Sequence, residues 1–366
     1  MLLEGFVQLS VDRAQRFHEV RNAVWRQTSM IGMSDEVILV NSSESESMNI
    51  DPVCPVCQSH EWEVLGRKTW TVESMAGMDP IFRRRMRVVF EVWLPGSTDF
   101  TAQSLGCRQC GFVIYSPRPT AADIDNKYRF LTSIKSPEVK PRLDSEENIR
   151  RCNEIIVPVL PLWPQAGRVR VLDFGGGDGR LMQRFVERGA DCFVVDYVHE
   201  TVPGVTRLGD TLDDLPEHIE PFDFIISSHV IEHVAEPREI MGQLRSLLKP
   251  RGAHLVAVPH EIWRAAPLQP EPVTHVNFFT EQSLQALFVN TGYEVLHSST
   301  RAVPTSGIMQ TEIVVVGRPS ANPGVAPNGY DRLKQLLNPD LMTYFWWFKR
   351  HPRRMLRQIK NRVLGK

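Results

Sequence analysis

Short apolar runs alternate with longer amphipathic stretches between residues 166 and 318. The apolar runs are RVRVLDF, DCFVVD, FDFIIS, AHLVAVP, YEVLHSS and TEIVVVG, and helices fit the segments around 179–188, 237–248 and 280–290. Strands that alternate with helices form a mostly parallel sheet that the helices cover on both faces. Residues 166–318 are therefore predicted to form a doubly wound α/β domain.

The rest of the chain lacks this alternation. Residues 1–47 are polar and end in NSSESES, which predicts a flexible leader. Residues 48–120 hold two cysteine pairs, and the strand-like run RMRVVFEVWL between them predicts a β hairpin. Residues 121–165 are compatible with a helical connector, and residues 319–366 with a linker and a tail.

Composition and charge exclude several classes of protein. The chain has 366 residues, of which 42% are hydrophobic, so it can bury at least one sizeable core. A formal net charge of -1 argues against a general nucleic-acid-binding protein, because phosphate binding usually requires a basic domain. Neither a signal peptide nor an apolar run of roughly 20 residues is apparent, and a cytoplasmic location is expected.

The tail has its own chemistry. The aromatic cluster TYFWWF is followed by KRHPRRMLRQIKNRVLGK, which holds many cations and no acid. Such a segment suits the interface of an anionic membrane and predicts peripheral contact at the inner membrane face. A solvated tail, or one that docks on a protein partner, is the alternative.

Four of the six cysteines form two Cys-x-x-Cys pairs, Cys54 with Cys57 and Cys107 with Cys110. In a reducing cytoplasm such pairs indicate metal binding rather than disulfides. Four thiolates complete a tetrahedral zinc site with no open position for water, so the predicted zinc has a folding role. Disulfides or unpaired core thiols are the alternative.

The segment VRVLDFGGGDGRL, residues 169–181, leads from an apolar strand through a glycine cluster towards a helix, where doubly wound sheets bind nucleotides. Glycine lets a ligand approach the backbone, and a helix start favours an anionic group. A dinucleotide fingerprint would need glycine at position 180, which is Arg180, and this disfavours NAD. Asp196, at the end of the next strand, can accept hydrogen bonds from ribose hydroxyls. An ordinary tight turn is the alternative.

Asp173 and the glycines at 175, 177 and 179 resemble motif I of class I S-adenosylmethionine-dependent methyltransferases. The resemblance continues through SSHVIEHVAEP, LLKPRGAHLVAVP and HVNFFTEQSLQALFVNTGYEV. It implies a Rossmann-like fold with S-adenosylmethionine as the cofactor, its methionine part in the turn, its ribose on Asp196, and its adenine beside Asp210 or Thr211. The residues predicted to bind the cofactor are Asp173, Gly175, Gly177, Gly179, Asp196, Asp210, Thr211 and His229.

Two similar patterns point elsewhere and are rejected. HVIEH, residues 229–233, matches the HxxEH pattern of inverted zinc peptidases, but it follows a sheet strand at the position expected in a methyltransferase. Methyltransferases of exocyclic amines carry an Asn/Asp-Pro-Pro-aromatic motif after that strand, where this chain has SSHV. Adenine N6 and glutamine amides are therefore disfavoured as acceptors.

The segment CRQCGFVIYSPRPTAADIDNKY resembles the N-terminal zinc-binding region of sugar methyltransferases, where this module helps to form the acceptor side of the cleft. The resemblance implies O- or C-methylation of a sugar, either nucleotide-linked or within a surface glycan. Another small metabolite, such as a quinone or a polyketide, is the next alternative. An RNA-directed methyltransferase would use the zinc module and the basic tail, but acidic residues in the segment 213–220 disfavour an RNA track. A non-catalytic cofactor-binding protein is a further class.

A hydroxyl or carbon acceptor has to lose a proton, and histidine suits that task at neutral pH. The predicted catalytic residues are His275, His233 and Glu232, with His275 as the general base. His275 lies in PVTHVNFFT, in a loop expected at the carboxyl edge of the sheet, where ligands bind. Carbon-methylating sugar enzymes are similar there but carry a His-Glu pair where this chain has Val273 and Thr274, which argues against carbon methylation. The alternative is that His275 only ties its loop to the sheet.

Overall fold

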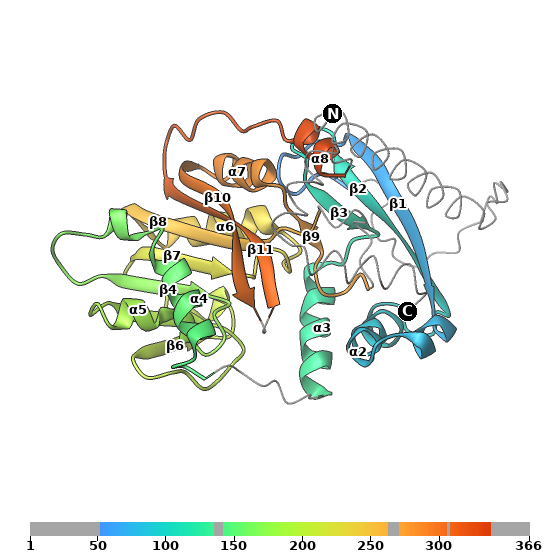
Figure 1. Ribbon diagram of the computed structural model, residues 1–366, viewed down its shortest axis with the longest axis horizontal. Helices are drawn as coiled ribbons and strands as arrows, with labels where there is room; N and C mark the ends of the chain where they lie inside the picture. The colour runs from blue at the N-terminus through green and yellow to red at the C-terminus, as the bar shows by residue number, and fades with distance from the viewer. Residues whose placement is uncertain (1–51, 135–141, 263–270, 306–307, 338–366) are drawn as a thin grey trace, which may run out of the picture. The chain divides into compact units, whose positions relative to one another are not determined.

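The computed structural model describes residues 52–134, 142–262, 271–305 and 308–337 (Figure 1). All of them belong to one unit, residues 48–366. The leader predicted over residues 1–47 and the aromatic and basic end of the tail, to which the membrane prediction applies, lie outside the described residues. Among the residues that are described, no helix has both the length and the apolar composition needed to cross a membrane.

A seven-stranded sheet is the larger of two sheets (Figure 1). Its strands are β4 (Arg170–Phe174), β5 (Asp191–Val195), β6 (Val205–Gly209), β7 (Phe222–Ser228), β8 (Leu248–Pro259), β10 (Tyr293–Thr305) and β11 (Ile308–Pro319). They lie in the order β10-β11-β8-β7-β4-β5-β6, and only the pairs that β11 forms with β8 and β10 are antiparallel. The doubly wound, Rossmann-like α/β class predicted from the sequence is confirmed.

Helices cover this sheet on both faces. They are α4 (Glu146–Ile156), α5 (Gln183–Val186), α6 (Pro237–Ser246) and α7 (Glu281–Asn290). Side chains of α6 and α7 join the apolar core on one face, and side chains of α4 and α5 join the core on the other. The predicted helices around 237–248 and 280–290 are present, whereas the segment 179–188 contains only the 3₁₀ turn η4 (Arg180–Met182) and the short α5.

The strand β6 is an element that the sequence did not predict. Its sequence VTRLG is mixed in polarity, because β6 lies at the edge of the sheet and only its first and last residues are buried. The six runs predicted as strands are all present. Short 3₁₀ turns complete this part of the chain, η3 (Leu160–Leu162) and η5 (Leu212–Asp214).

A second, four-stranded sheet has the order β1-β2-β3-β9. Its strands are β1 (Trp62–Thr71), β2 (Asp99–Cys107), β3 (Val113–Ser116) and β9 (Asn277–Phe278). The strand β9 follows His275 directly, and it pairs with β3 through Val113 opposite Phe278. The cysteine-containing segment therefore shares a sheet with the loop that carries the predicted general base.

The assignment of RMRVVFEVWL to a β hairpin is wrong. This run forms the end of α2 (Pro80–Val88) and the π-helical turn η2 (Val89–Trp93), after the 3₁₀ turn η1 (Glu73–Gly77). Asp79 caps α2 by accepting a hydrogen bond from the Ile81 amide at 2.8 Å, and Pro80 takes the first helical position. The apolar residues of this run, which are also typical of a strand, form the buried face of a helix. The antiparallel pair between the two cysteine pairs is instead formed by β1 and β2.

Two further helices contact the smaller sheet. Helix α3 (Ala121–Ser133) starts at a capping box in which the Thr120 and Asp123 side chains satisfy each other's backbone amides. Helix α8 (Tyr330–Leu337) lies beside β2 (Figure 1), where the Tyr330 hydroxyl donates a hydrogen bond to Glu63 at 2.7 Å. The described part of the predicted tail thus packs on the cysteine-containing segment.

Candidate active site

The glycine turn follows β4 at the carboxyl edge of the large sheet. Gly175, Gly177 and Gly179 all have positive φ, at 71°, 62° and 75°. A Cβ on Gly175 would lie 2.5 Å from a methyl group of Val230, so only glycine lets the loop after β7 pack here. A Cβ on Gly177 would meet nothing within 4 Å, and this side of the turn is therefore open to a ligand.

Asp173 lies directly beneath the turn. Its side chain is completely buried, and neither carboxylate oxygen has a hydrogen-bond partner among the described residues. Burial, with the charges of Asp196 and Asp178, raises the pKa of Asp173 to about 8. A buried carboxylate in this state fits a cationic ligand group, such as the ammonium of the methionine part of S-adenosylmethionine.

The other predicted cofactor residues lie at the ends of β5 and β6. Asp196 follows β5, and its carboxylate accepts hydrogen bonds from the amides of Gly177 at 2.9 Å and Val198 at 3.0 Å. The Asp196 amide donates to the Gly209 carbonyl at 3.0 Å, immediately before Asp210 and Thr211. The structure therefore brings Asp173, the glycine turn, Asp196, Asp210 and Thr211 to one edge of three neighbouring strands.

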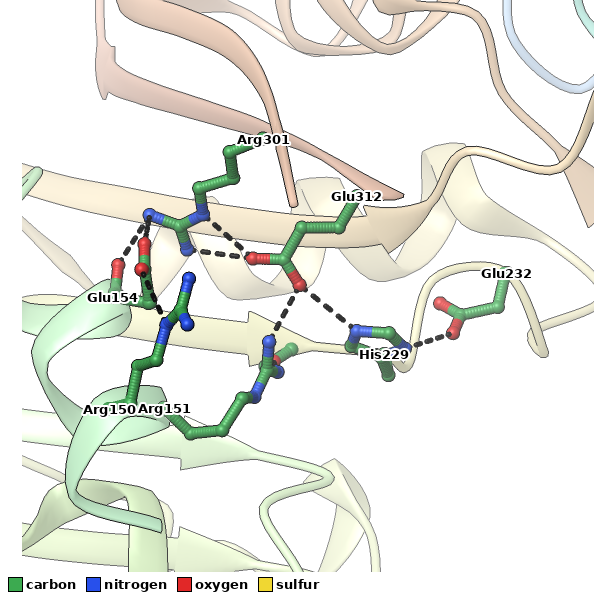
Figure 2. Close-up of polar contacts among 8 residues, drawn as sticks. Arg150, Arg151, Glu154, His229, Glu232, Arg301 and Glu312 are labelled. Atoms are coloured by element: carbon green, nitrogen blue, oxygen red, sulfur yellow. Dashed lines mark hydrogen bonds and ion pairs between the residues drawn. The ribbon is translucent and has the colours of Figure 1, made fainter. Parts of the chain in front are cut away.

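His229 has a different set of contacts. It follows β7 in a left-handed conformation, with φ at 58°, and its Nε2 atom lies 3.1 Å from Glu312. Glu312, on β11, is fully buried and also contacts Arg151 of α4 and Arg301 of β10, each at 2.8 Å (Figure 2). Burial alone would raise the pKa of Glu312, but His229 and the two arginines lower it to about 2. His229 is thus tied to a buried ionic network rather than to the glycine turn.

The three predicted catalytic residues lie together, and we call Glu232, His233 and His275 the histidine cluster. One ligand-type atom from each lies within 4.8 Å of the others, and the two imidazole rings are 4.8 Å apart. The His275 Nδ1 atom is 2.7 Å from a Glu261 carboxylate oxygen, and the His233 Nδ1 atom is 2.6 Å from the Thr274 carbonyl oxygen. Both rings are therefore held in fixed orientations.

The protonation of the histidine cluster depends on burial. Burial raises the pKa of Glu232, and burial together with the charge of His275 lowers the pKa of His233 well below its usual value. Burial also opposes the charged form of His275, but the hydrogen bond and charge of Glu261 outweigh it and raise the pKa of His275. His275 is the member of the cluster best suited to accept a proton.

Four residues of this site were missed by the sequence analysis. Lys127 and Tyr128 come from α3, Glu261 follows β8, and Glu271 precedes the loop of His275. The Lys127 side chain is buried and donates to the Val273 carbonyl at 3.3 Å, and burial lowers its pKa to about 8. A signal was available for Lys127, because it interrupts the apolar face that Ile124, Tyr128 and Leu131 form at helical spacing.

Glu271 organises the loop before His275. It accepts hydrogen bonds from the amides of Val273 at 2.7 Å and Thr274 at 3.0 Å, and from the Thr274 hydroxyl. Arg85 of α2 contacts the same carboxylate at 3.2 Å. Glu271 thus connects the loop that carries His275 to Arg85 of α2. Nothing in the local sequence indicated this connection.

The histidine cluster and the glycine turn are neighbours. Val230, which packs on Gly175, accepts a hydrogen bond from the His233 amide at 2.9 Å through its carbonyl. Burial, together with the negative charges of Glu232 and Asp196, raises the pKa of Tyr128 on α3. Its ring stacks on Tyr197, with centroids 6.1 Å apart.

The four cysteines of the two pairs also lie together, and we call them the cysteine cluster. The Sγ atoms of Cys54 and Cys110 are 3.6 Å apart and those of Cys57 and Cys107 are 3.5 Å apart, with no disulfide. Zinc–sulfur bonds of about 2.3 Å in a tetrahedron place sulfur atoms roughly 3.8 Å apart, so the cluster fits zinc. Both pairs form similar turns, which end in left-handed Gln58 and Gly111.

This chain is similar to known methyltransferases over part of its length. Residues 145–298 match the family described as "Methyltransferase domain". A ubiquinone biosynthesis O-methyltransferase of Cereibacter sphaeroides is 34% identical over 96 residues, and a tRNA 5-carboxymethoxyuridine methyltransferase of Escherichia coli is 29% identical over 99 residues. Each match covers 23% of this chain and 38% of the relative.

One solved structure among those similar to this chain is a 1,6-didemethyltoxoflavin-N1-methyltransferase of Burkholderia thailandensis with bound S-adenosylhomocysteine. It is 18% identical, with a TM-score of 0.38, and the match covers 48% of this chain and 80% of that one.

Proposed function

We propose that the chain, a methyltransferase by its matched domain, uses S-adenosylmethionine to methylate a sugar, nucleotide-linked or in a surface glycan, or a similar small metabolite. The contact of Val230 with both the glycine turn and the histidine cluster is the observation that carries this proposal. It supports a cofactor site next to a proton acceptor. S-adenosylmethionine, when bound, supplies a methyl group on a sulfonium, whose sulfur keeps the bonding electron pair when the acceptor takes the methyl.

The residues at the ends of three strands would hold the cofactor. Asp173 would pair with its ammonium group, and the open side of the turn at Gly177 would accept its methionine backbone. The Asp196 oxygens each accept one amide hydrogen bond and keep lone pairs for ribose hydroxyls. Asp210 and Thr211 would lie beside adenine.

His275 has the contacts of a general base. Its Nδ1–H donates to Glu261, which leaves the Nε2 lone pair to take the proton that an acceptor hydroxyl or carbon must lose. Lys127 and Glu271 bind the carbonyl and the amide of the peptide that joins Val273 and Thr274, so the loop before the ring keeps its position. An aligned base and an aligned donor account for the largest part of catalysis in such a displacement.

We infer that the cysteine cluster holds a structural zinc. Three of its residues belong to the apolar core that also covers the α6 and α7 face of the sheet. The strand β9 pairs with β3, and Arg118 donates to the Val276 carbonyl at 3.0 Å and to the Asn277 side chain at 2.7 Å. Through these contacts the zinc module supports the loop of His275 and forms the acceptor side of the site.

RNA is the second candidate acceptor, because one relative is named as a tRNA methyltransferase. The zinc module and the basic tail would then bind the RNA. Exposed acidic residues on η5 and after it, close to the expected adenine position, oppose this alternative: Asp213, Asp214, Glu217 and Glu220.

Transfer of a radiolabelled methyl group to a panel of acceptors tests the proposal. The panel contains nucleotide sugars, phenolic quinone precursors and total tRNA, with the full-length protein and labelled S-adenosylmethionine. Label in a nucleotide sugar supports the sugar assignment, and label in tRNA alone transfers the assignment to RNA. Calorimetric binding of NAD without any response to S-adenosylmethionine or S-adenosylhomocysteine would overturn the function as a whole.

A further inference from the structure

We propose that the histidine cluster binds a divalent transition-metal ion, and that this ion binds the acceptor oxygen of the methyl transfer. The inference rests on the proposed function and deepens it, because it gives the acceptor a site. Glu232 and His233 come from the loop after β7, and His275 comes from the loop before β9. One oxygen and two nitrogen atoms from these residues lie within 4.8 Å of one another, as the ligands of one ion do.

The state of Glu232 is a second, independent observation. Its side chain is 1% exposed, and both carboxylate oxygens lack a hydrogen-bond partner among the described residues. The closest basic groups are the imidazoles of His229 and His233, at 3.7 Å and 3.6 Å. Buried carboxylates are normally hydrogen-bonded, paired or bound to a metal, so a cation bound here would give Glu232 the partner that the described residues do not supply.

The orientation of the two histidines is a third observation. Nδ1 of His233 faces the Thr274 carbonyl, and Nδ1 of His275 faces the Glu261 carboxylate. Both partners accept hydrogen bonds, so each Nδ1 carries the proton and each Nε2 presents a lone pair. Metal-binding histidines are held in this way, with the second ring nitrogen donating to a carbonyl or a carboxylate.

The ligand set indicates which ions fit. Two imidazole nitrogens and one carboxylate oxygen suit manganese, iron, cobalt or zinc, whereas calcium and magnesium prefer oxygen ligands throughout. The cysteine cluster differs, because four thiolates leave no position for another ligand. Three protein ligands leave open positions, and an acceptor hydroxyl can occupy one of them.

A bound ion would change the route of the acceptor's proton. An oxygen on a divalent cation loses its proton at a much lower pH, so the O–H bond breaks to water while the O–CH₃ bond forms and the S–CH₃ bond breaks. His275 then acts as a ligand, and its Nε2 atom does not take the proton directly. Oxygen acceptors gain most from this arrangement, in keeping with the loss of the His-Glu pair before His275.

Manganese binding to the full-length protein tests the proposal. The protein is prepared without a metal-affinity tag and keeps the zinc of its cysteine cluster, and Mn²⁺ is titrated while free Mn²⁺ is followed by electron paramagnetic resonance. We expect about one Mn²⁺ per chain for the wild type and at least tenfold weaker binding for Glu232→Gln and His275→Gln. Glu261→Gln, which replaces the charged partner of His275 with a neutral amide, should weaken binding by roughly 10-fold or more.

His218→Gln is the matched control, because His218 is exposed and lies outside the cluster. It should bind Mn²⁺ as the wild type does. Equal binding by the wild type, His275→Gln and Glu232→Gln, or no binding by any of them, would overturn the proposal. If Glu232→Gln fails to fold, the comparison of His275→Gln with His218→Gln decides.

Calorimetry with S-adenosylmethionine on the same protein separates the two proposals. Cofactor binding without Mn²⁺ binding leaves the proposed function intact and removes the metal. Mn²⁺ binding without cofactor binding supports the metal site and contradicts the proposed function.

Discussion

The cysteine cluster and the histidine cluster both gather metal-ligating side chains, but they are built differently. The four cysteines come from two local turns of similar geometry, and three of them lie in the continuous apolar core. The histidine cluster takes its members from two loops, and each ring is oriented by a partner from elsewhere in the chain. Four thiolate ligands fill every position of a structural metal site, whereas three ligands of mixed type leave a coordination position open for a substrate. Substitutions in the two clusters should therefore change different quantities.

The largest effect is expected in the cysteine cluster. Cys107→Ser should lose the zinc, about one per chain, and with it much of the module's stability, because structural zinc contributes on the order of 10 kcal/mol in small zinc-binding peptides. Elemental analysis and thermal unfolding of protein made without a metal-affinity tag measure both. Cys192→Ser is the control, because Cys192 is buried in the apolar core on the other face of the sheet. This substitution should lower stability by about 1 kcal/mol without changing the zinc content. A Cys54–Cys57 disulfide in a reducing preparation would contradict the zinc.

The next largest effect concerns Glu312, which supports the loop of the histidine cluster through His229. Glu312→Gln leaves Arg151 buried without its counter-charge and Arg301 with Glu154 alone, which should lower the free energy of unfolding by about 3–5 kcal/mol. Because the pKa of Glu312 is lowered to about 2, the wild type should lose the same contribution as the pH falls from about 4.5 towards 2. Urea unfolding at several pH values measures both.

Glu294→Gln, at an exposed position of β10, is the control for Glu312. It should change stability by less than about 0.5 kcal/mol. A similar small change in Glu312→Gln would show that the network of Figure 2 contributes little.

The effect expected at His275 is smaller in free energy and is confined to turnover. His275→Gln should lower turnover by roughly 10²-fold or more while the affinity for S-adenosylmethionine and the melting temperature stay nearly unchanged. His218→Gln should keep full turnover. If His275→Gln also kept full turnover, or lost stability in step with activity, His233 would become the better candidate for the base.

The two clusters also differ in what the sequence alone could predict. The spacing of Cys54, Cys57, Cys107 and Cys110 identifies the cysteine cluster, because each pair forms its turn locally. His233 and His275 could be named only as separate candidates, since their proximity depends on two distant loops, in which His233 contacts Thr274, 41 positions further along the chain. Glu261 had no local signal, because its role appears only once it faces His275.

The fold shows the same division between local and distant information. Apolar runs predicted six strands of the large sheet, and four of these (β4, β5, β7 and β8) form parallel pairs and are apolar because both of their faces are covered. The edge strand β6 was missed, and RMRVVFEVWL was misassigned, because a helical face and a strand can share an apolar composition. The ion pair of Arg151 with Glu312 joins residues 161 positions apart, and no local pattern predicts such a pair.

A change of stability with pH tests whether the cofactor site, like the histidine cluster, holds a charge that the described residues do not compensate. The pKa of Asp173 is about 8 in the folded protein and 3.8 in an unfolded chain, so between these values the folded state binds the extra proton. The stability of the cofactor-free protein should therefore fall as the pH rises through this window, by at most about 1.4 kcal/mol per pH unit. Asp173→Asn should flatten that slope in urea unfolding and weaken the binding of S-adenosylmethionine, whose ammonium loses its partner. Asp99→Asn, at an exposed position of β2, should change neither, and an equal slope in the wild type and Asp173→Asn would show that Asp173 is compensated without the cofactor.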